Sequence, residues 1–104
     1  MGVILPNQKV WDPAHWVEMD FFENCIPLLD RAPSLSRGVQ HCLDAEYASL
    51  DLSAPHPGQL QELIALVEGV ISTIEAESFR DGGRETYLER IRDLRILIRE
   101  SCGL

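Results

Sequence analysis

The stretch that decides the fold is QLQELIALVEGVISTIEAE, residues 59–77. Its apolar side chains recur every three or four positions, which is the spacing of one face of an α-helix. They are Leu60, Leu63, Ile64, Val67, Val70, Ile71 and Ile74. The stripe is wide enough to pack against two neighbours at once. The segment is therefore predicted to be a helix buried against two other elements.

A second helix is predicted over residues 84–101, where the same spacing recurs. Its inward residues are Tyr87, Leu88, Ile91, Leu94 and Ile98. Asp81-Gly82-Gly83 turns the chain just before it, and Cys102-Gly103 ends it. Because the connection between the two helices is short, they are expected to form an antiparallel hairpin.

Asp12-Pro13 is the first clear helix start in the chain. Asp is a favoured N-cap residue, and Pro at the first helical position loses no hydrogen bond. The inward stripe that follows is Val17, Phe21, Cys25 and Leu28, widened by Phe22, Ile26 and Leu29. Pro27 cannot continue a helix without a clash, so the helix is expected to kink there or to stop near Asn24.

Residues 38–50 fit two structures. A helical stripe is formed by Val39, Cys42, Leu43, Tyr47 and Leu50. A strand-like alternation is formed by Val39, His41, Leu43, Ala45 and Tyr47. Length and the lack of clustered β-branched residues favour the helix.

Residues 2–10 suit a short edge strand or an ordered arm. The whole chain, residues 1–104, is thus predicted to be one mainly α domain, a small bundle of about four helices.

Charge is distributed very unevenly along the chain. Twelve acidic residues and two basic ones, Arg31 and Arg37, lie between Val10 and Glu77, in a protein of net charge −8. Such a surface repels phosphate backbones and anionic membranes and attracts basic proteins. The composition, 45% hydrophobic and 25% charged, is that of an ordinary globular domain.

The sequence predicts a cytoplasmic location. Apolar runs are too short to span a membrane, and residues 1–10 contain Pro6 and no apolar core of a signal peptide. Cys25, Cys42 and Cys102 are odd in number and widely spaced, as is typical of reduced intracellular thiols.

Catalytic motifs are missing from the sequence. Asp51, Ser53 and His56 lie close together, but a nucleophile also needs an oriented base and an oxyanion site. Asp51-x-Ser53 is therefore interpreted as a turn or a helix cap. Gly82-Gly83 is not followed by the residues of a phosphate-binding loop, and no cofactor is expected.

Basic residues gather only in the last predicted helix. They are Arg84, Arg90, Arg92, Arg95 and Arg99, and they alternate with Glu85, Glu89, Asp93 and Glu100. Nucleic-acid binding needs a predominantly basic face. The mixed pattern instead predicts a helix surface laced with salt bridges.

The candidate partner-binding residues are two indoles and seven acids. They are Trp11, Asp12, Trp16, Glu18, Asp20, Glu23, Asp44, Glu46 and Asp51. Trp is common among the residues that anchor interfaces, and the acids can build a negative surface around it. In the alternative interpretation one Trp packs in the core, the other holds the N-terminal arm on the bundle, and the acids form a solvated face.

These features resemble the immunity proteins of bacterial toxin–immunity pairs, especially those of contact-dependent growth inhibition. The resemblance lies in the length, the acidic span, the helical pattern and the aromatic start WDPAHW at residues 11–16. It implies a cytoplasmic antidote without enzymatic activity. Such an antidote would be a monomer that binds one cognate basic toxin, such as a tRNA-cleaving nuclease, as a 1:1 heterodimer. The family shares no motif from which binding residues can be carried over.

Two alternatives remain at this point. Small acidic secretion chaperones have similar size and charge, but they usually form dimers. A small metal-dependent helical enzyme would use His15, Glu18, His41 and Glu46, although the sequence offers no second matching pair of ligands at helical spacing.

Overall fold

The structure is a computed structural model that describes residues 2–45, 48–76 and 83–101. Its elements in chain order are β1 (Gly2–Ile4), η1 (Pro6–Gln8), β2 (Val10–Trp11), α1 (His15–Cys25), η2 (Ile26–Arg31), η3 (Pro33–Leu35), α2 (Ser36–Asp44), β3 (Ser49–Asp51), α3 (Gln59–Ala76) and α4 (Gly83–Ser101), where η marks a 3-10 helix. The predicted fold class, a small mainly α bundle with a short strand at the N-terminus, is confirmed.

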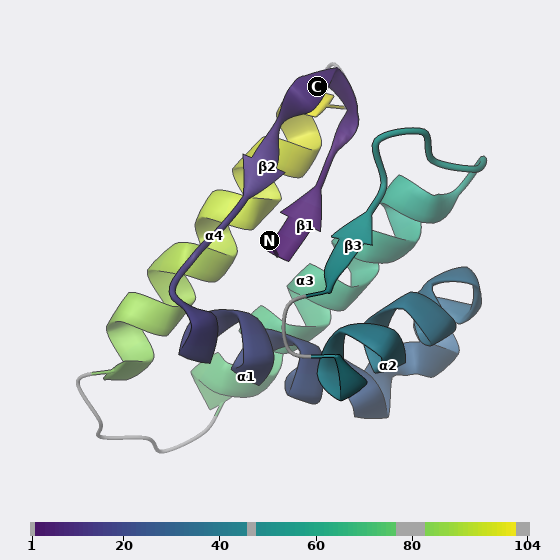
Figure 1. Cartoon of the computed structure of the whole chain (residues 1–104). Coiled ribbons are helices and arrows are strands. Elements are labelled where there is room, and N and C mark those ends of the chain that lie inside the picture. The colour runs from purple at the N-terminus through teal and green to yellow at the C-terminus, as the bar shows by residue number, and fades with distance from the viewer. Residues whose placement is uncertain (1, 46–47, 77–82, 102–104) are drawn as a thin grey trace.

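The two long helices α3 and α4 pack side by side, as the periodicity of residues 59–77 and 84–101 predicted (Figure 1). Their facing sides supply fully buried residues such as Leu63, Leu66, Ile91 and Leu94. Of the predicted turn Asp81-Gly82-Gly83, the first two residues lie outside the described residues and Gly83 is the first residue of α4. Tertiary packing of these apolar faces, more than local propensity, is what stabilises helices of this kind.

The N-terminal segment forms the middle of a small sheet with strand order β2-β1-β3. In β1, Val3 pairs with Trp11 of antiparallel β2 and with Leu50 of parallel β3. The expected short strand is therefore present, but its predicted edge position was wrong, because β1 has a neighbour on both sides and Val3 is fully buried. The parallel partner is distant in the sequence, so no local pattern announces it.

Residues 38–50, whose pattern fitted either a helix or a strand, contain both. The favoured helix is present up to Asp44, the last residue of α2, and the end of the segment is β3. Tyr47 lies outside the described residues. Both halves bury apolar residues, Val39 and Cys42 from the helix and Leu50 from the strand.

Helix α1 begins two residues later than predicted. Its N-cap residue is Ala14 where Asp12 was predicted, and its first helical residue is His15 where Pro13 was predicted. The reason is that Trp11 is still extended in β2, so the chain must bend before it can become helical. The predicted stop is confirmed: α1 ends at Cys25, and Pro27 lies in the first turn of η2.

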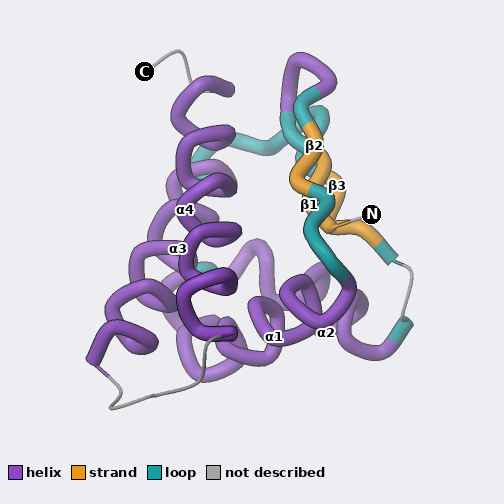
Figure 2. Tube along the Cα trace, turned by 90° about the vertical axis from the view of Figure 1, so that its left-hand side faces the viewer, coloured by secondary structure: helices purple, strands orange, loops and turns teal. Residues whose placement is uncertain are grey.

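One hydrophobic core joins the three strands, the four α-helices, η2 and η3. Seen from the side, the sheet and the α3–α4 hairpin stand opposite each other, with α1 and α2 below them (Figure 2). Aromatic rings fill the space between: Trp11 meets Phe21 edge-on at 5.3 Å between ring centroids, and Phe21 lies 5.6 Å from Phe22. No helix in the described parts of the chain is long and apolar enough to cross a membrane.

Candidate interaction surface

Trp11 belongs to the core and not to a binding surface. Only 3% of the residue is exposed, and its indole Nε1–H donates a hydrogen bond of 2.8 Å to the backbone carbonyl of Arg90. This bond attaches β2 to α4. The prediction that Trp11 contacts a partner is thus wrong for the folded chain, and the alternative in which one Trp packs in the core is confirmed.

Glu18 is also an interior residue. Its exposed fraction is 3%, and its Oε1 accepts a hydrogen bond of 2.9 Å from the backbone N–H of Gly2. The sequence placed this carboxylate on a partner surface, and the structure places it between α1 and the start of β1. A buried carboxylate that accepts a backbone N–H has a structural role and cannot meet a partner's cation.

Trp16 remains available to a partner. It is 45% exposed, and its ring stacks on that of Tyr87 with 6.3 Å between centroids and 29° between planes. The Tyr87 hydroxyl accepts a hydrogen bond of 3.0 Å from Nδ2 of Asn24, which also belongs to α1. Trp16 therefore rests on α4, and it does not hold the N-terminal arm as the alternative interpretation suggested.

Two of the predicted acids share a face of α1 with this indole. Asp20 and Glu23 follow Trp16 by four and seven positions, and all three side chains are exposed. Helix α1 contains no Lys or Arg that could compensate these charges. The structure thus brings Trp16, Asp20 and Glu23 together in one outer stripe.

The other predicted acids lie elsewhere. Asp12 precedes α1 and Asp44 ends α2, both exposed, and Glu46 falls outside the described residues. Asp51 ends β3, where its Oδ1 accepts hydrogen bonds from the backbone N–H (3.0 Å) and the hydroxyl (2.7 Å) of Ser53. These bonds lower the pKa of the Asp51 carboxyl, and the predicted Asp51-x-Ser53 turn is confirmed.

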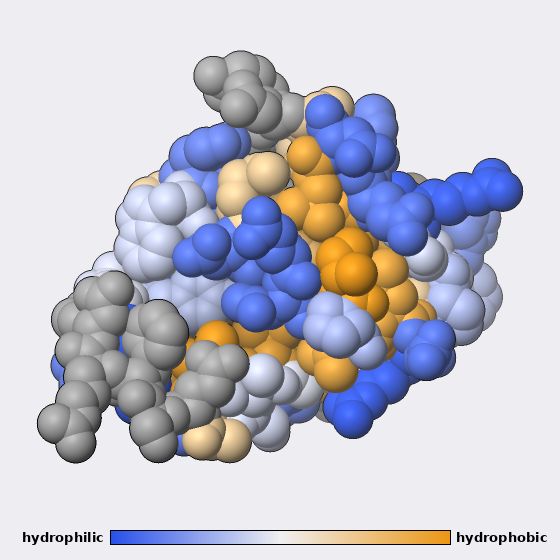
Figure 3. Space-filling model, turned by 90° about the horizontal axis from the view of Figure 1, so that it is seen from below, coloured by the Kyte–Doolittle hydropathy of each residue, from blue (hydrophilic) through white to orange (hydrophobic). Residues whose placement is uncertain are grey.

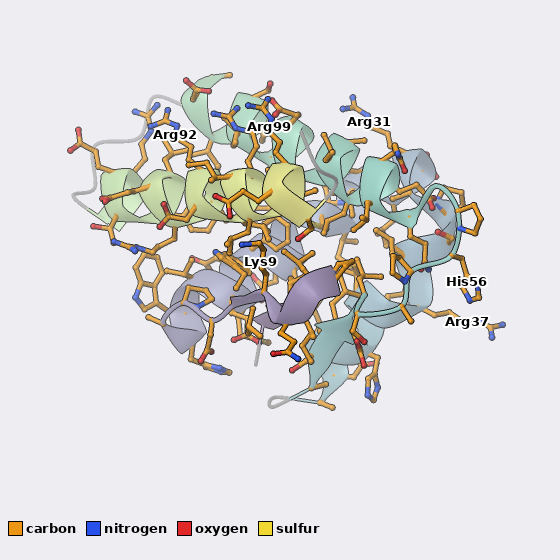
Figure 4. All side chains as sticks on the ribbon, turned by 90° about the horizontal axis from the view of Figure 1, so that it is seen from above. Lys9, Arg31, Arg37, His56, Arg92 and Arg99 are labelled. Atoms are coloured by element: carbon orange, nitrogen blue, oxygen red, sulfur yellow. The ribbon has the colours of Figure 1, made fainter. Side chains whose placement is uncertain are left out.

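The ion pairs between described side chains gather on α4, as the mixed charge pattern of that helix predicted. They are Lys9–Glu100 (2.8 Å), Arg90–Asp93 (3.1 Å), Arg95–Glu68 (3.3 Å), Arg90–Glu89 (3.5 Å), Arg92–Glu75 (3.6 Å) and Arg99–Glu68 (4.0 Å). Figure 4 shows Arg92 and Arg99 along the side of α4 that borders α3. The arginines of α4 are thus occupied within the molecule.

The exposed acids on α1, η2 and α2 take part in none of these ion pairs. They are Asp20, Glu23, Asp30 and Asp44. The two arginines of the same region, Arg31 and Arg37, are exposed; the Arg31 guanidinium lies beside Gly69 of α3, and Arg37 points outward (Figure 4). Asp51, Glu62 and Glu85 also take part in none of these ion pairs, so acids without an ion-pair partner lie on β3, α3 and α4 as well, but α1, η2 and α2 contribute four.

Ile26 is a surface residue that the sequence did not reveal. The helical pattern assigned it to the inward stripe, yet it is 41% exposed as the first residue of η2. The change from α-helix to 3-10 helix alters the number of residues per turn, so the inward stripe loses its register there. Pro27, directly after it, was the available signal.

The metal-dependent alternative gains no support from the arrangement of its residues. Among the described residues, no group of three or more His, Cys, Asp or Glu side chains could hold a metal ion. His15 and His41 are exposed, whereas Glu18 is interior. Their side chains therefore offer no common site.

The cysteines whose surroundings are described are free thiols in the interior. Cys25 and Cys42 are both buried, and burial raises the pKa of each thiol. A high pKa leaves little of the reactive thiolate at neutral pH, so neither residue fits the role of a nucleophile. Cys102 lies outside the described residues.

No protein-family model, curated protein or solved structure matches this chain. The exposed stripe on α1 is therefore interpreted from its side chains alone. Trp16 offers an apolar contact and the acids offer charged ones, and protein interfaces combine these two kinds of contact.

Proposed function

We propose that this chain is an immunity-type binding protein that neutralises a basic protein, such as a nuclease toxin. The observation that carries the proposal is the division of charge in the fold. Arginines of α4 are paired inside the molecule, whereas Asp20, Glu23, Asp30 and Asp44 have no ion-pair partner among the described residues. Carboxylates left without internal cations are available to the cations of another protein.

A nuclease suits such a surface because its cleft must be positive to hold phosphates. Opposite charges also accelerate the encounter of two proteins, and the encounter must be fast when a toxin has to be captured before it acts. The exposed Trp16 adds an apolar contact beside the charges. The proposal assigns no catalytic role to any residue and requires no cofactor.

Coexpression with a toxin tests this function. The candidate toxins are basic proteins encoded beside the gene for this chain, and the readouts are growth of the producing cells and the Kd of the purified pair. We expect coexpression to restore growth and the pair to form a 1:1 complex. If the toxin remains lethal and the purified proteins do not bind, the proposal is wrong.

Charge reversal locates the contact. Asp20→Lys combined with Glu23→Lys should weaken binding by a factor of about ten or more, because attraction becomes repulsion. Glu85→Lys combined with Glu89→Lys makes the same change in net charge on the exposed start of α4 and is the matched control. Equal Kd values for the two double variants would show that α1 is not the recognition surface.

The mass in solution separates this proposal from the chaperone alternative. An immunity-type protein is expected to be a monomer of 11.7 kDa before it meets its partner. Light scattering measures that mass directly. A strict homodimer across the accessible concentration range would favour the secretion chaperone.

A further inference from the structure

The outer stripe of α1 (Trp16, Asp20 and Glu23) is followed along the chain by Ile26, the exposed first residue of η2, so an exposed apolar residue comes before and after the two carboxylates. Trp16 begins the stripe, Asp20 and Glu23 follow on the same face, and Ile26 comes three residues after Glu23. The exposed fractions of the two apolar residues are 45% and 41%. Ten residues of helix correspond to about 15 Å along the axis, so the two apolar contacts are well separated.

The indole at the start of the stripe is already held in place. Stacking on Tyr87 and the hydrogen bond between Asn24 and the Tyr87 hydroxyl fix the platform beneath Trp16. Ordering an interface side chain opposes binding by about 0.5–1.5 kcal/mol when that side chain is free in the unbound protein. A preorganised Trp avoids much of that loss, which is a property of residues that dominate binding energy.

The underside of the molecule, where α1 and α2 lie, exposes apolar surface between groups of hydrophilic side chains (Figure 3). Specific protein interfaces combine buried apolar contacts with polar and charged ones. Asp20 and Glu23 are not neutralised by any ion pair with the described residues. A partner can therefore bury Trp16 and Ile26 while its own cations meet these carboxylates.

Building on the proposed function, we infer that the outer stripe of α1 and the adjoining Ile26 dock in a groove of the basic partner: Trp16 and Ile26 enter two apolar pockets, and Asp20 and Glu23 meet the cations between them. The carboxylates exclude nucleic acid and an anionic membrane as the occupant. A second copy would place acidic stripe against acidic stripe across a two-fold axis. A basic protein is the occupant that complements both features of the stripe.

In this docking mode the charged contacts and the apolar contacts affect different rate constants. Exposed charges act mainly on the association rate and on its dependence on salt, whereas buried apolar contacts act mainly on the dissociation rate. A purely ionic cover over a phosphate-binding cleft would lose most of its affinity in salt. Docking through Trp16 and Ile26 leaves a substantial part of the affinity at high salt.

Alanine variants at matched positions test this docking mode, with the toxin of the coexpression experiment as the probe. Ile26→Ala and Trp16→Ala should each raise the dissociation rate about tenfold or more, with little change in the salt dependence of association. Ile96→Ala is the control, because Ile96 is 52% exposed but lies on α4. Its dissociation rate should stay within about twofold of the wild-type rate. Circular dichroism and urea unfolding confirm that each variant is folded.

The outcomes separate this inference from the function on which it rests. If wild-type protein binds the toxin but Ile26→Ala and Trp16→Ala behave like Ile96→Ala, the docking mode is wrong and the function stands. If the wild-type protein binds no toxin, the docking mode and the proposed function are both wrong. A homodimer that dissociates in the Trp16→Ala variant would identify a second copy as the occupant and would also overturn the inference.

Discussion

The carboxylate of Glu18 accepts a hydrogen bond from the Gly2 N–H although only 3% of the residue is exposed. Replacing it by a side chain of similar length without an acceptor leaves that buried N–H unsatisfied, which destabilises a fold by about 1–3 kcal/mol. We expect Glu18→Met to lower the free energy of unfolding by that amount. Glu18→Gln keeps an acceptor oxygen and should lower it less. Urea denaturation of both variants measures the difference, and equal stabilities would show that the bond contributes nothing.

The Cys42 thiol makes stability depend on alkaline pH. Burial, and secondarily the negative charge of Glu18, raises the pKa of Cys42 from 9.0 to about 11. The folded state therefore keeps a proton that the unfolded state loses, so this contribution is complete below pH 9 and disappears as the pH rises toward 11. We expect the free energy of unfolding to fall by about 1–2 kcal/mol between pH 8 and pH 10.5 on this account.

Removing the thiol provides the control for this effect. The Cys42→Ala variant should lose less stability than the wild-type protein over the same pH interval, although Cys25 still contributes in both. Guanidinium denaturation at several pH values is the measurement. Identical pH profiles for the two proteins would mean that Cys42 has the same pKa in both states.

At the scale of elements, α4 is held by its apolar stripe more than by its ion pairs. Leu94 is fully buried, whereas Glu68, which pairs with Arg95 and Arg99, has a side chain that is 44% exposed. Leu94→Ala should lower the free energy of unfolding by about 2–5 kcal/mol through loss of burial and a cavity. Glu68→Gln should change it by less than about 1 kcal/mol, because half-exposed ion pairs contribute little. Urea denaturation compares the two, and a larger effect for Glu68→Gln would contradict this order.

The elements also differ in how well the sequence predicts them. The helices α3 and α4 were predicted almost to the residue, because their apolar spacing is a local property of the chain. The middle position of β1 was not predicted, because its parallel partner β3 lies more than forty residues away. The late start of α1 has the same origin, since the pairing of Trp11 with Val3 keeps the chain extended.

At the scale of the whole molecule, a net charge of −8 opposes folding through repulsion between like charges. Salt screens this repulsion, and the half-exposed ion pairs of α4 lose little by the same screening. We expect Tm to rise by about 2–5 °C between 10 and 200 mM NaCl. Thermal unfolding followed by circular dichroism measures the shift.

A variant with a smaller charge provides the comparison. Asp20→Asn combined with Glu23→Asn should reduce the salt-induced rise of Tm, because it removes two carboxylates that no described cation pairs with. A fall of Tm with salt in the wild-type protein would instead show that the ion pairs on α4 outweigh the repulsion. The difference in salt dependence between the wild-type protein and this variant gives the repulsion due to Asp20 and Glu23, and what remains in the variant is due to the other acids.

The sequence by itself determined the helical class, the limits of the long helices and the acidic character, because periodicity and charge are local quantities. The tertiary structure alone decided which members of similar pairs lie on the surface. Trp11 is fixed inside by a carbonyl 79 positions away, while Trp16 lies exposed on Tyr87. Glu18 turns inward to an amide 16 positions away, while Asp20 stays outside. Contacts between distant parts of the chain depend on how the elements pack. A helical pattern predicts only which side of a helix faces the core.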